Sequence, residues 1–192
     1  MQEISQALGV TCNYCHSAER GSRQPEPKKD IARVMIAITR DLNAKIEAAA
    51  GKNTARVDCV TCHRGVAIPR QLDEILLQTL REQGASAAVG QYLELRSRYY
   101  GRQAYDFGED TLIGVAQRVA DAKPDDAVAL LQLNLEFYPR SAHSYMALAH
   151  AYTRKIDDAS AMSALEKALE IEPENGIARG QLEQLRSYHR NR

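Results

Sequence analysis

The sequence predicts an all-α protein in which a small N-terminal domain precedes a solenoid of helical hairpins. Ala, Leu, Gln, Glu and Arg dominate most segments, while Val, Ile and Thr are sparse, and this mixture favours helix over strand. Pro139 and Pro173 lie 34 residues apart, and each follows a similar pair of helix-patterned segments. We therefore expect a domain at 1–70, a helical connector at 71–107 and a repeat domain at 108–192.

Two helices are expected in the N-terminal domain. A short one covers 1–8, and a longer one runs from an N-cap at Asp30 to about Ala50, where Gly51 ends it. The segment between them, 17–29, contains one glycine and two prolines and is expected to be a loop. The apolar face of the longer helix is formed by Ile31, Val34, Met35, Ile38, Leu42 and Ile46.

The rest of the chain also shows helical periodicity. Two amphipathic helices are expected over 71–98, separated near Gly84, and a tyrosine-rich turn at 99–107 follows them. The segment at about 108–190 resembles tetratricopeptide repeats, which are pairs of antiparallel helices stacked on one another. The residues that carry this resemblance best are Tyr145, Leu148, Ala149, Tyr152, Ala161, Leu165 and Ala168.

Charge and hydropathy exclude several classes of protein. Lys and Arg together number 25, as do Asp and Glu, and this balance argues against a nucleic-acid-binding protein. No apolar run approaches the roughly 20 residues that a transmembrane helix needs. Residues 1–20 lack the basic and apolar regions of a signal peptide, so export would require that the numbering begin on a processed or trimmed chain.

The chemistry-bearing pattern is Cys-x-x-Cys-His, which occurs twice and uses all four cysteines of the chain. Two thiols three residues apart on a helical turn can reach the two vinyl groups of one haem, and the following histidine then faces the iron. The sequence therefore predicts two covalently attached haem c groups. The predicted attachment and iron-binding residues are Cys12, Cys15 and His16 for the first haem and Cys59, Cys62 and His63 for the second.

Other uses of the cysteines explain less. Two Cys-x-x-Cys pairs also suit a zinc ion held by four thiolates, but 43 residues separate Cys15 from Cys59, and zinc does not require a histidine after each pair. Disulfides would leave both histidines without a role. We favour haem over both alternatives.

Three segments resemble the photosynthetic reaction-centre cytochrome c subunit family: 8–16 (LGVTCNYCH), 27–35 (PKKDIARVM), and 60–65 (VTCHRG) with Pro69. The resemblance covers residues 1–70. It implies a c-type cytochrome whose haems are attached outside the cytoplasmic membrane, so that the protein would be periplasmic or extracellular. Family members carry two or four haems, and the two motifs here exclude a four-haem subunit for this sequence as it stands.

The resemblance also implies axial ligands, because in this family a methionine on the helix before each motif usually binds the iron. Met1 lies 11 residues before Cys12, and Met35 lies 24 residues before Cys59. Alternatively, Met35 is an ordinary core methionine and Met1 an ordinary first residue. Several cations are candidates for pairing with the haem propionates, or are simply solvated charges: Lys28, Lys29, Arg33 and Arg64.

The sequence thus favours an electron carrier over an enzyme, since an iron with six ligands exchanges electrons but does not readily bind substrate. Its expected partners are redox proteins, for which the repeats offer a docking surface. A dihaem peroxidase with one open iron is the alternative. A third hypothesis is a filament of head-to-tail copies with a continuous chain of haems. His143 and His150 share one face of a repeat helix, and they are either surface or inter-helix histidines or, in one case, a haem ligand for a neighbouring chain.

Overall fold

The computed structural model describes residues 2–16 and 27–190, and within these ranges every regular element is a helix, which confirms the all-α prediction. Contacts between Cα atoms divide the chain into two compact units. We call residues 1–69 with 101–104 the N-terminal unit, and residues 70–100 with 105–192 the C-terminal unit. None of the described helices is both long and apolar enough to cross a membrane.

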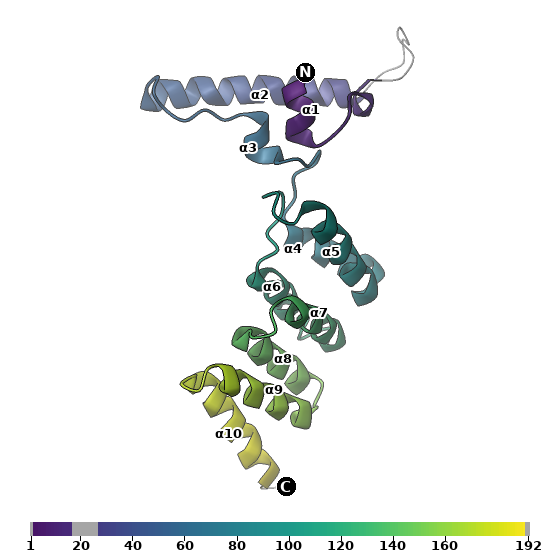
Figure 1. The fold of residues 1–192 in the computed structure, drawn as a ribbon, viewed down its shortest axis with the longest axis vertical. Helices are drawn as coiled ribbons and strands as arrows, with labels where there is room; N and C mark the ends of the chain where they lie inside the picture. Colours follow the sequence, from purple (N-terminus) through teal and green to yellow (C-terminus); the bar gives the residue numbers. More distant parts are fainter. Residues whose placement is uncertain (1, 17–26, 191–192) are drawn as a thin grey trace. The chain divides into compact units, whose positions relative to one another are not determined.

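Helix α2 (Pro27–Ala50) is the longest element of the N-terminal unit, in which α1 (Gln2–Leu8) packs against α3 (Cys59–His63) (Figure 1). A 3-10 turn, η1 (Cys12–Tyr14), follows α1. The expectation that Asp30 caps α2 is wrong, because the helix begins three residues earlier. Proline has a backbone angle already suited to the first turn, and Asp30 then lies where the positive end of the helix dipole favours a carboxylate.

The N-terminal unit has almost no core made of side chains. Among its described residues only Ala7 is buried. The apolar face predicted for α2 is formed, but most of it is exposed: its most exposed member, Ile31, is 62 % exposed, and Met35 is 41 % exposed.

In the C-terminal unit α4 packs on α5, and each helix from α6 to α9 packs on the next one along the chain. Contacts also join α4 to α6, α5 to α7 and α6 to α8, so consecutive hairpins stack on one another (Figure 1). Pro139 and Pro173 follow the ends of α7 and α9, and Gly84 separates α4 from α5, as predicted. The helices are α4 (Leu72–Gln83), α5 (Ala85–Tyr99), α6 (Glu109–Val119), α7 (Pro124–Phe137), α8 (Ala142–Arg154), α9 (Asp158–Ile171) and α10 (Gly176–Arg190).

A continuous core of leucines, alanines and aromatic residues runs through these hairpins. Buried alanines on α8 and α9 let the two helices approach closely, which is why this pair needs few large side chains. At the start of the unit, Tyr92 packs edge-on against Phe107 with ring centres 5.6 Å apart. The Arg96 guanidinium lies 4.1 Å from the Tyr100 ring and 4.0 Å from the Phe137 ring.

Candidate functional site

The first Cys-x-x-Cys-His motif forms a tight turn after α1. The Cys12 carbonyl accepts hydrogen bonds from the backbone N–H groups of Cys15, at 3.3 Å, and His16, at 3.0 Å. This turn brings the two cysteines and the histidine into one short segment with both thiols free. The Lys28 ammonium lies 3.8 Å from the centre of the Tyr14 ring, so a cation–π contact joins the motif to the first turn of α2.

The second motif is the helix α3 itself. Its start is held by the hydroxyl of Thr61, which accepts a hydrogen bond from the Asp58 N–H at 3.0 Å. The preceding residue, Val57, is fixed to the middle of α2: the Asn43 amide donates to the Val57 carbonyl and accepts from the Val57 N–H, both at 2.8 Å. The Asn43 side chain thus satisfies both backbone groups of Val57, and it anchors the segment before the second motif to α2.

The imidazole of His63 has a defined orientation. Its Nδ1 atom lies 3.0 Å from the carbonyl oxygen of Val66, and because a carbonyl can only accept, Nδ1 carries the proton. In the neutral imidazole, Nε2 then keeps its lone pair. That is the protonation state an iron ligand needs, and a carbonyl partner of this kind commonly orients metal-binding histidines.

Between the two anchors on α2 lies its exposed apolar face. Lys28 contacts the first motif and Asn43 holds Val57, two residues before the second, and Met35 stands seven residues after Lys28 and eight before Asn43. At about 1.5 Å of rise per residue, these separations correspond to roughly 10 and 12 Å along the helix axis. The exposed apolar residues in this interval are Ile31, Val34, Met35, Ile38 and Leu42.

The geometry does not favour the zinc reading. All four cysteines are described and all four are free thiols. Across residues 2–16 and 27–190, no three His, Cys, Asp or Glu side chains come together in a group that could hold a metal ion. Among the described residues, the four thiols are therefore not gathered at one metal site.

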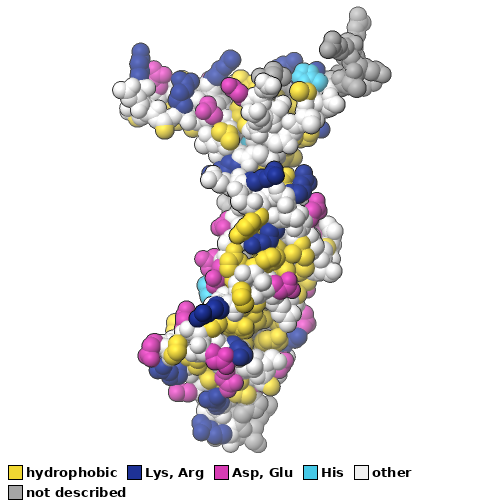
Figure 2. Space-filling model, viewed as in Figure 1, with side chains coloured by type: hydrophobic (Ala, Val, Ile, Leu, Met, Phe, Trp, Pro, Cys, Tyr) yellow, Lys and Arg dark blue, Asp and Glu magenta, His cyan; other side chains and the backbone are white. Residues whose placement is uncertain are grey.

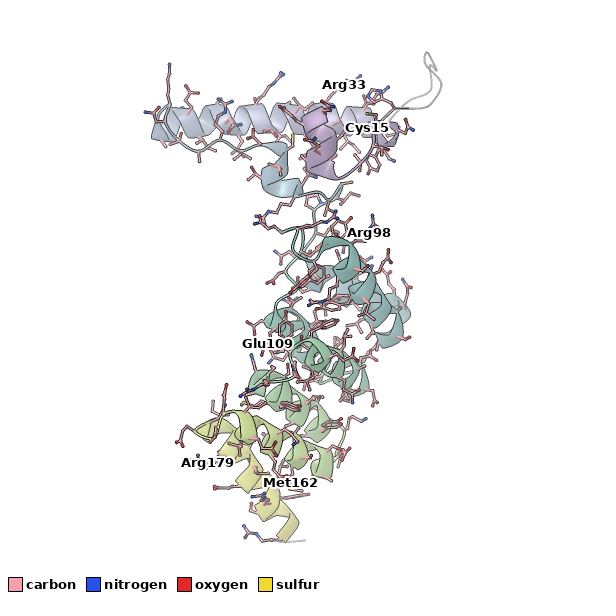
Figure 3. The ribbon with its side chains drawn as sticks, viewed as in Figure 1. Cys15, Arg33, Arg98, Glu109, Met162 and Arg179 are labelled. Carbon is pink, nitrogen blue, oxygen red and sulfur yellow. The ribbon has the colours of Figure 1, made fainter. Side chains whose placement is uncertain are left out.

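The remaining predicted residues are distributed as follows. Arg33 pairs with Asp30 one turn earlier, with both side chains exposed, and Arg64 is exposed in the left-handed conformation after α3. Figure 3 shows Cys15 on the segment after α1 and Arg33 on α2. Met1 lies outside the described residues. His143 and His150 are exposed on α8, where His143 Nδ1 lies 3.5 Å from an Asp110 carboxylate oxygen.

Four residues of this site carried no prediction. The glycines Gly9 and Gly65 flank the motifs, which was a visible signal, since a glycine beside a functional motif often permits a close backbone approach. Asn43 and Val66 gave no signal, because one pairs across 14 residues and the other acts only through its backbone oxygen.

Two thiol pairs, a histidine after each and an exposed apolar face beside them fit the needs of covalent haem c. The thiols suit thioether bonds to the vinyl groups, an imidazole oriented through Nδ1 by the Val66 carbonyl suits the iron, and the apolar face suits a porphyrin. The fit rests on the chemistry of these side chains and on the exposure of α2.

Comparison with known proteins agrees with this fit. The family model described as photosynthetic reaction centre cytochrome C subunit matches residues 1–101, which is more than half of the chain. Cytochrome c-554 of Chloroflexus aurantiacus is 40 % identical to this chain over 63 residues. The matched segment is 32 % of this chain and 15 % of that relative, so the similarity covers a small part of the relative's length.

Proposed function

The chain belongs to the photosynthetic reaction-centre cytochrome c subunit family, and from this premise we propose that it is an exported electron carrier with two covalent haem c groups. Membership in the family makes it a c-type cytochrome of electron transfer. The number of haems, the ligands, the compartment and the role of the C-terminal unit are our proposals.

In this proposal each motif holds one haem. Thioether bonds form at Cys12 and Cys15 for the first and at Cys59 and Cys62 for the second, and the proximal ligands are His16 and His63. When bound, a haem supplies an iron that gains or loses one electron at a time. The residues of the chain orient the imidazoles, exclude water and balance charge.

The observation that carries the proposal is the exposed apolar face of α2 between its two anchors. A face of five large apolar side chains is costly to leave in water, at about 25 cal/mol per Å² of apolar surface. Because both motifs are fastened to this same helix, a porphyrin attached to either one lies within reach of the face. Packed there, the two haems supply the core that the side chains of this unit do not form.

Met35 is proposed as the sixth ligand of the second haem. Its side chain is exposed on the apolar face, and a thioether sulfur is a soft, neutral ligand that raises the potential relative to a second histidine. Met35→Leu should cost less than about 1.5 kcal/mol as a packing change, yet should lower the potential of one haem and open it to carbon monoxide. Met162→Leu in the C-terminal unit is the matched control and should leave the spectrum unchanged.

If the potential and spin state of Met35→Leu equal those of the wild type, Met35 only packs against the porphyrin. The sixth ligand then has to come from elsewhere, and His143 and His150 are the candidates to replace next.

Charge supports the binding of propionates in the N-terminal unit. This unit contains 11 Lys and Arg against 7 Asp and Glu, whereas the C-terminal unit contains 14 against 18. The propionates of two haems would offset the basic excess. We propose that Lys28, Arg33 and Arg64 contribute to this compensation; the exposed pair of Arg33 with Asp30 is weak enough to rearrange.

The C-terminal unit is proposed as a docking surface for a redox protein, or for another copy of the chain. On the face seen in Figure 2, hydrophobic side chains gather over the helices of this unit, among both acidic and basic ones. A filament is the extreme case of such self-association, and electron microscopy of the purified protein at rising concentration tests it. Absence of any assembly, with a redox partner still bound, would leave docking as the role of this unit.

A dihaem peroxidase is the second candidate, and one observation favours it. Among the described residues of the N-terminal unit, Met35 is the only methionine, and no histidine is present besides those of the two motifs. The described residues of this unit therefore offer no sixth ligand for the first iron beyond Met35, which is assigned to the second. Rapid binding of cyanide by the oxidised protein, together with turnover of hydrogen peroxide, would establish the enzyme; slow binding and no turnover would establish the carrier.

The decisive experiment for haem number combines mass and colour. The intact protein should exceed the mass of the chain by two haems, the haem should remain on the chain in a denaturing gel, and the pyridine haemochrome spectrum should report haem c. Replacing Cys12 and Cys15 by serine should remove one haem, and replacing Cys59 and Cys62 the other. A colourless, zinc-containing protein would end the proposal. Recovery of haem-bearing protein from the cytoplasm alone would contradict export.

A further inference from the structure

Gly9 and Gly65 bring the two motifs into direct backbone contact. Gly9 stands three residues before Cys12, and Gly65 stands two residues after His63. The N–H of Gly65 donates a 2.8 Å hydrogen bond to the carbonyl of Ala7, in the last turn of α1. Figure 1 shows α1 beside α3, and the contacts between these helices are the most extensive of the N-terminal unit. Ala7 is also the one buried residue described in that unit.

The backbone conformation at this crossing requires glycine at position 9. Gly9 ends α1 in the left-handed conformation, with φ of 65°, and Val10 N–H bonds back to the Ser5 carbonyl at 3.0 Å, which is the Schellman arrangement. A Cβ added to Gly9 would lie 2.1 Å from the carbonyl oxygen of Gly65. No side chain of any size fits there unless the Gly65–Val66 peptide moves.

The residue that holds the His63 ring is Val66, whose N–H belongs to the Gly65–Val66 peptide and whose carbonyl belongs to the next peptide. Val66 N–H donates to the His63 carbonyl at 2.8 Å, and the Val66 carbonyl accepts from His63 Nδ1 at 3.0 Å. Moving the Gly65–Val66 peptide away from Gly9 would displace Val66, and with it the carbonyl that orients the imidazole. A change beside the first motif would act on the ligand of the second.

We infer that the Gly9–Gly65 crossing is a positioning element that fixes the imidazole of His63, and with it the second haem, relative to the first attachment site. The inference rests on the proposed function. It makes Gly9 a positioning residue for the second haem although it lies beside the first one in sequence. The rate of electron exchange between two haems depends on their separation, and this contact joins the segments that flank the two motifs through backbone atoms.

The test is Gly9→Ala in the full two-haem protein, with Gly51→Ala as the matched control. Gly51 also has positive φ, at 88°, but a Cβ there meets nothing within 4 Å, so the control reproduces the backbone strain without the collision. Variants with serine at Cys12 and Cys15, or at Cys59 and Cys62, assign the two midpoint potentials. We expect Gly9→Ala to shift the potential of the second haem and to weaken its low-spin bands more than those of the first.

A second variant lacks residues 2–8 and so removes the partner of Gly65 without crowding it. This deletion should also shift the midpoint potential of the second haem. If the Gly9→Ala protein does not accumulate, the deletion variant alone tests the inference. If both variants bind two haems and the potential of the second haem is unchanged in each, the inference is overturned while the proposed function stands. If neither variant protein accumulates while Gly51→Ala does, the crossing is needed for the fold of the whole N-terminal unit. That result would also overturn the inference that it acts specifically on the second haem. A wild-type chain without haem overturns the proposed function itself.

Discussion

In the C-terminal unit, Leu76, Leu130 and Tyr92 have no exposed surface, whereas Ala7 alone is buried among the described residues of the N-terminal unit. Both units are helical, and both have apolar residues at helical spacing. The difference is that the hairpins of the C-terminal unit bury their apolar faces against each other, while most of the apolar face of α2 is exposed among the described residues. Helix formation alone therefore does not indicate where a domain obtains its stability.

The largest effect should come from removing every attachment point. With serine at Cys12, Cys15, Cys59 and Cys62, we expect the N-terminal unit to lose its helices, since one buried alanine cannot offset the conformational entropy of about 1–2 kcal/mol per ordered residue. The C-terminal unit should remain folded. Circular dichroism and limited proteolysis measure both outcomes. An N-terminal unit that stays resistant to protease without haem would remove the contrast between the units.

The next effect should be confined to the C-terminal unit. Leu130→Ala removes a fully buried side chain of α7 and should lower the free energy of unfolding of this unit by about 2–5 kcal/mol. Leu93→Ala on α5 is the control, because Leu93 is 42 % exposed and should cost far less. Haem spectra of both variants should match the wild type. A spectral change in Leu130→Ala would mean that the two units do not fold independently.

A smaller effect of opposite sign is expected at the turn between α8 and α9. Ile156 has φ of 59° and is 85 % exposed, so its branched side chain is strained there and gains little from packing. Ile156→Gly should stabilise the C-terminal unit by about 0.5–1 kcal/mol, seen as a higher melting temperature. Ile177→Gly, at an exposed position within α10, should give no stabilisation. Equal effects of the two would show that backbone strain is not the cause.

The smallest effect appears only in alkaline solution. Burial raises the pKa of Tyr92, against a partial lowering by Arg96, because the phenolate is poorly solvated within the core. A raised folded-state pKa adds stability that is complete below the ordinary tyrosine pKa of 10.0 and is lost as the pH rises through the folded value. The melting temperature of wild type should therefore fall more steeply than that of Tyr92→Phe above about pH 10. Parallel curves would contradict this cause.

The sequence was sufficient for the elements that depend on local signals. Apolar periodicity, Gly51, Gly84 and the two prolines located the helices, and the paired motifs located the candidate site. The start of α2 was misplaced because a capping residue and a first-turn acid look alike in sequence; Pro27 was the better signal. The family resemblance was confirmed by the match over residues 1–101.

What the sequence could not supply are contacts made by the backbone at a distance. The Asn43 side chain bonds the main-chain N–H and carbonyl of Val57, and any residue at position 57 except proline offers the same two groups. The collision expected at Gly9 depends on where Gly65 lies in space, which no spacing rule gives. The exposure of the α2 face was equally hidden, since an apolar stripe has the same pattern whether it packs on protein or on a porphyrin.

The aromatic cluster at the start of the C-terminal unit has a consequence for optical measurements. The chain has no tryptophan, and of its nine tyrosines only Tyr14 belongs to the N-terminal unit. Ultraviolet emission from the intact protein therefore originates almost wholly in the C-terminal unit, while visible absorption would originate in the other. Because haem quenches nearby emission by energy transfer, the brightness of Tyr92, Tyr99 and their neighbours would report the separation of the two units in solution. One sample then reports on the C-terminal unit through tyrosine emission and on the N-terminal unit through visible absorption, without any added label.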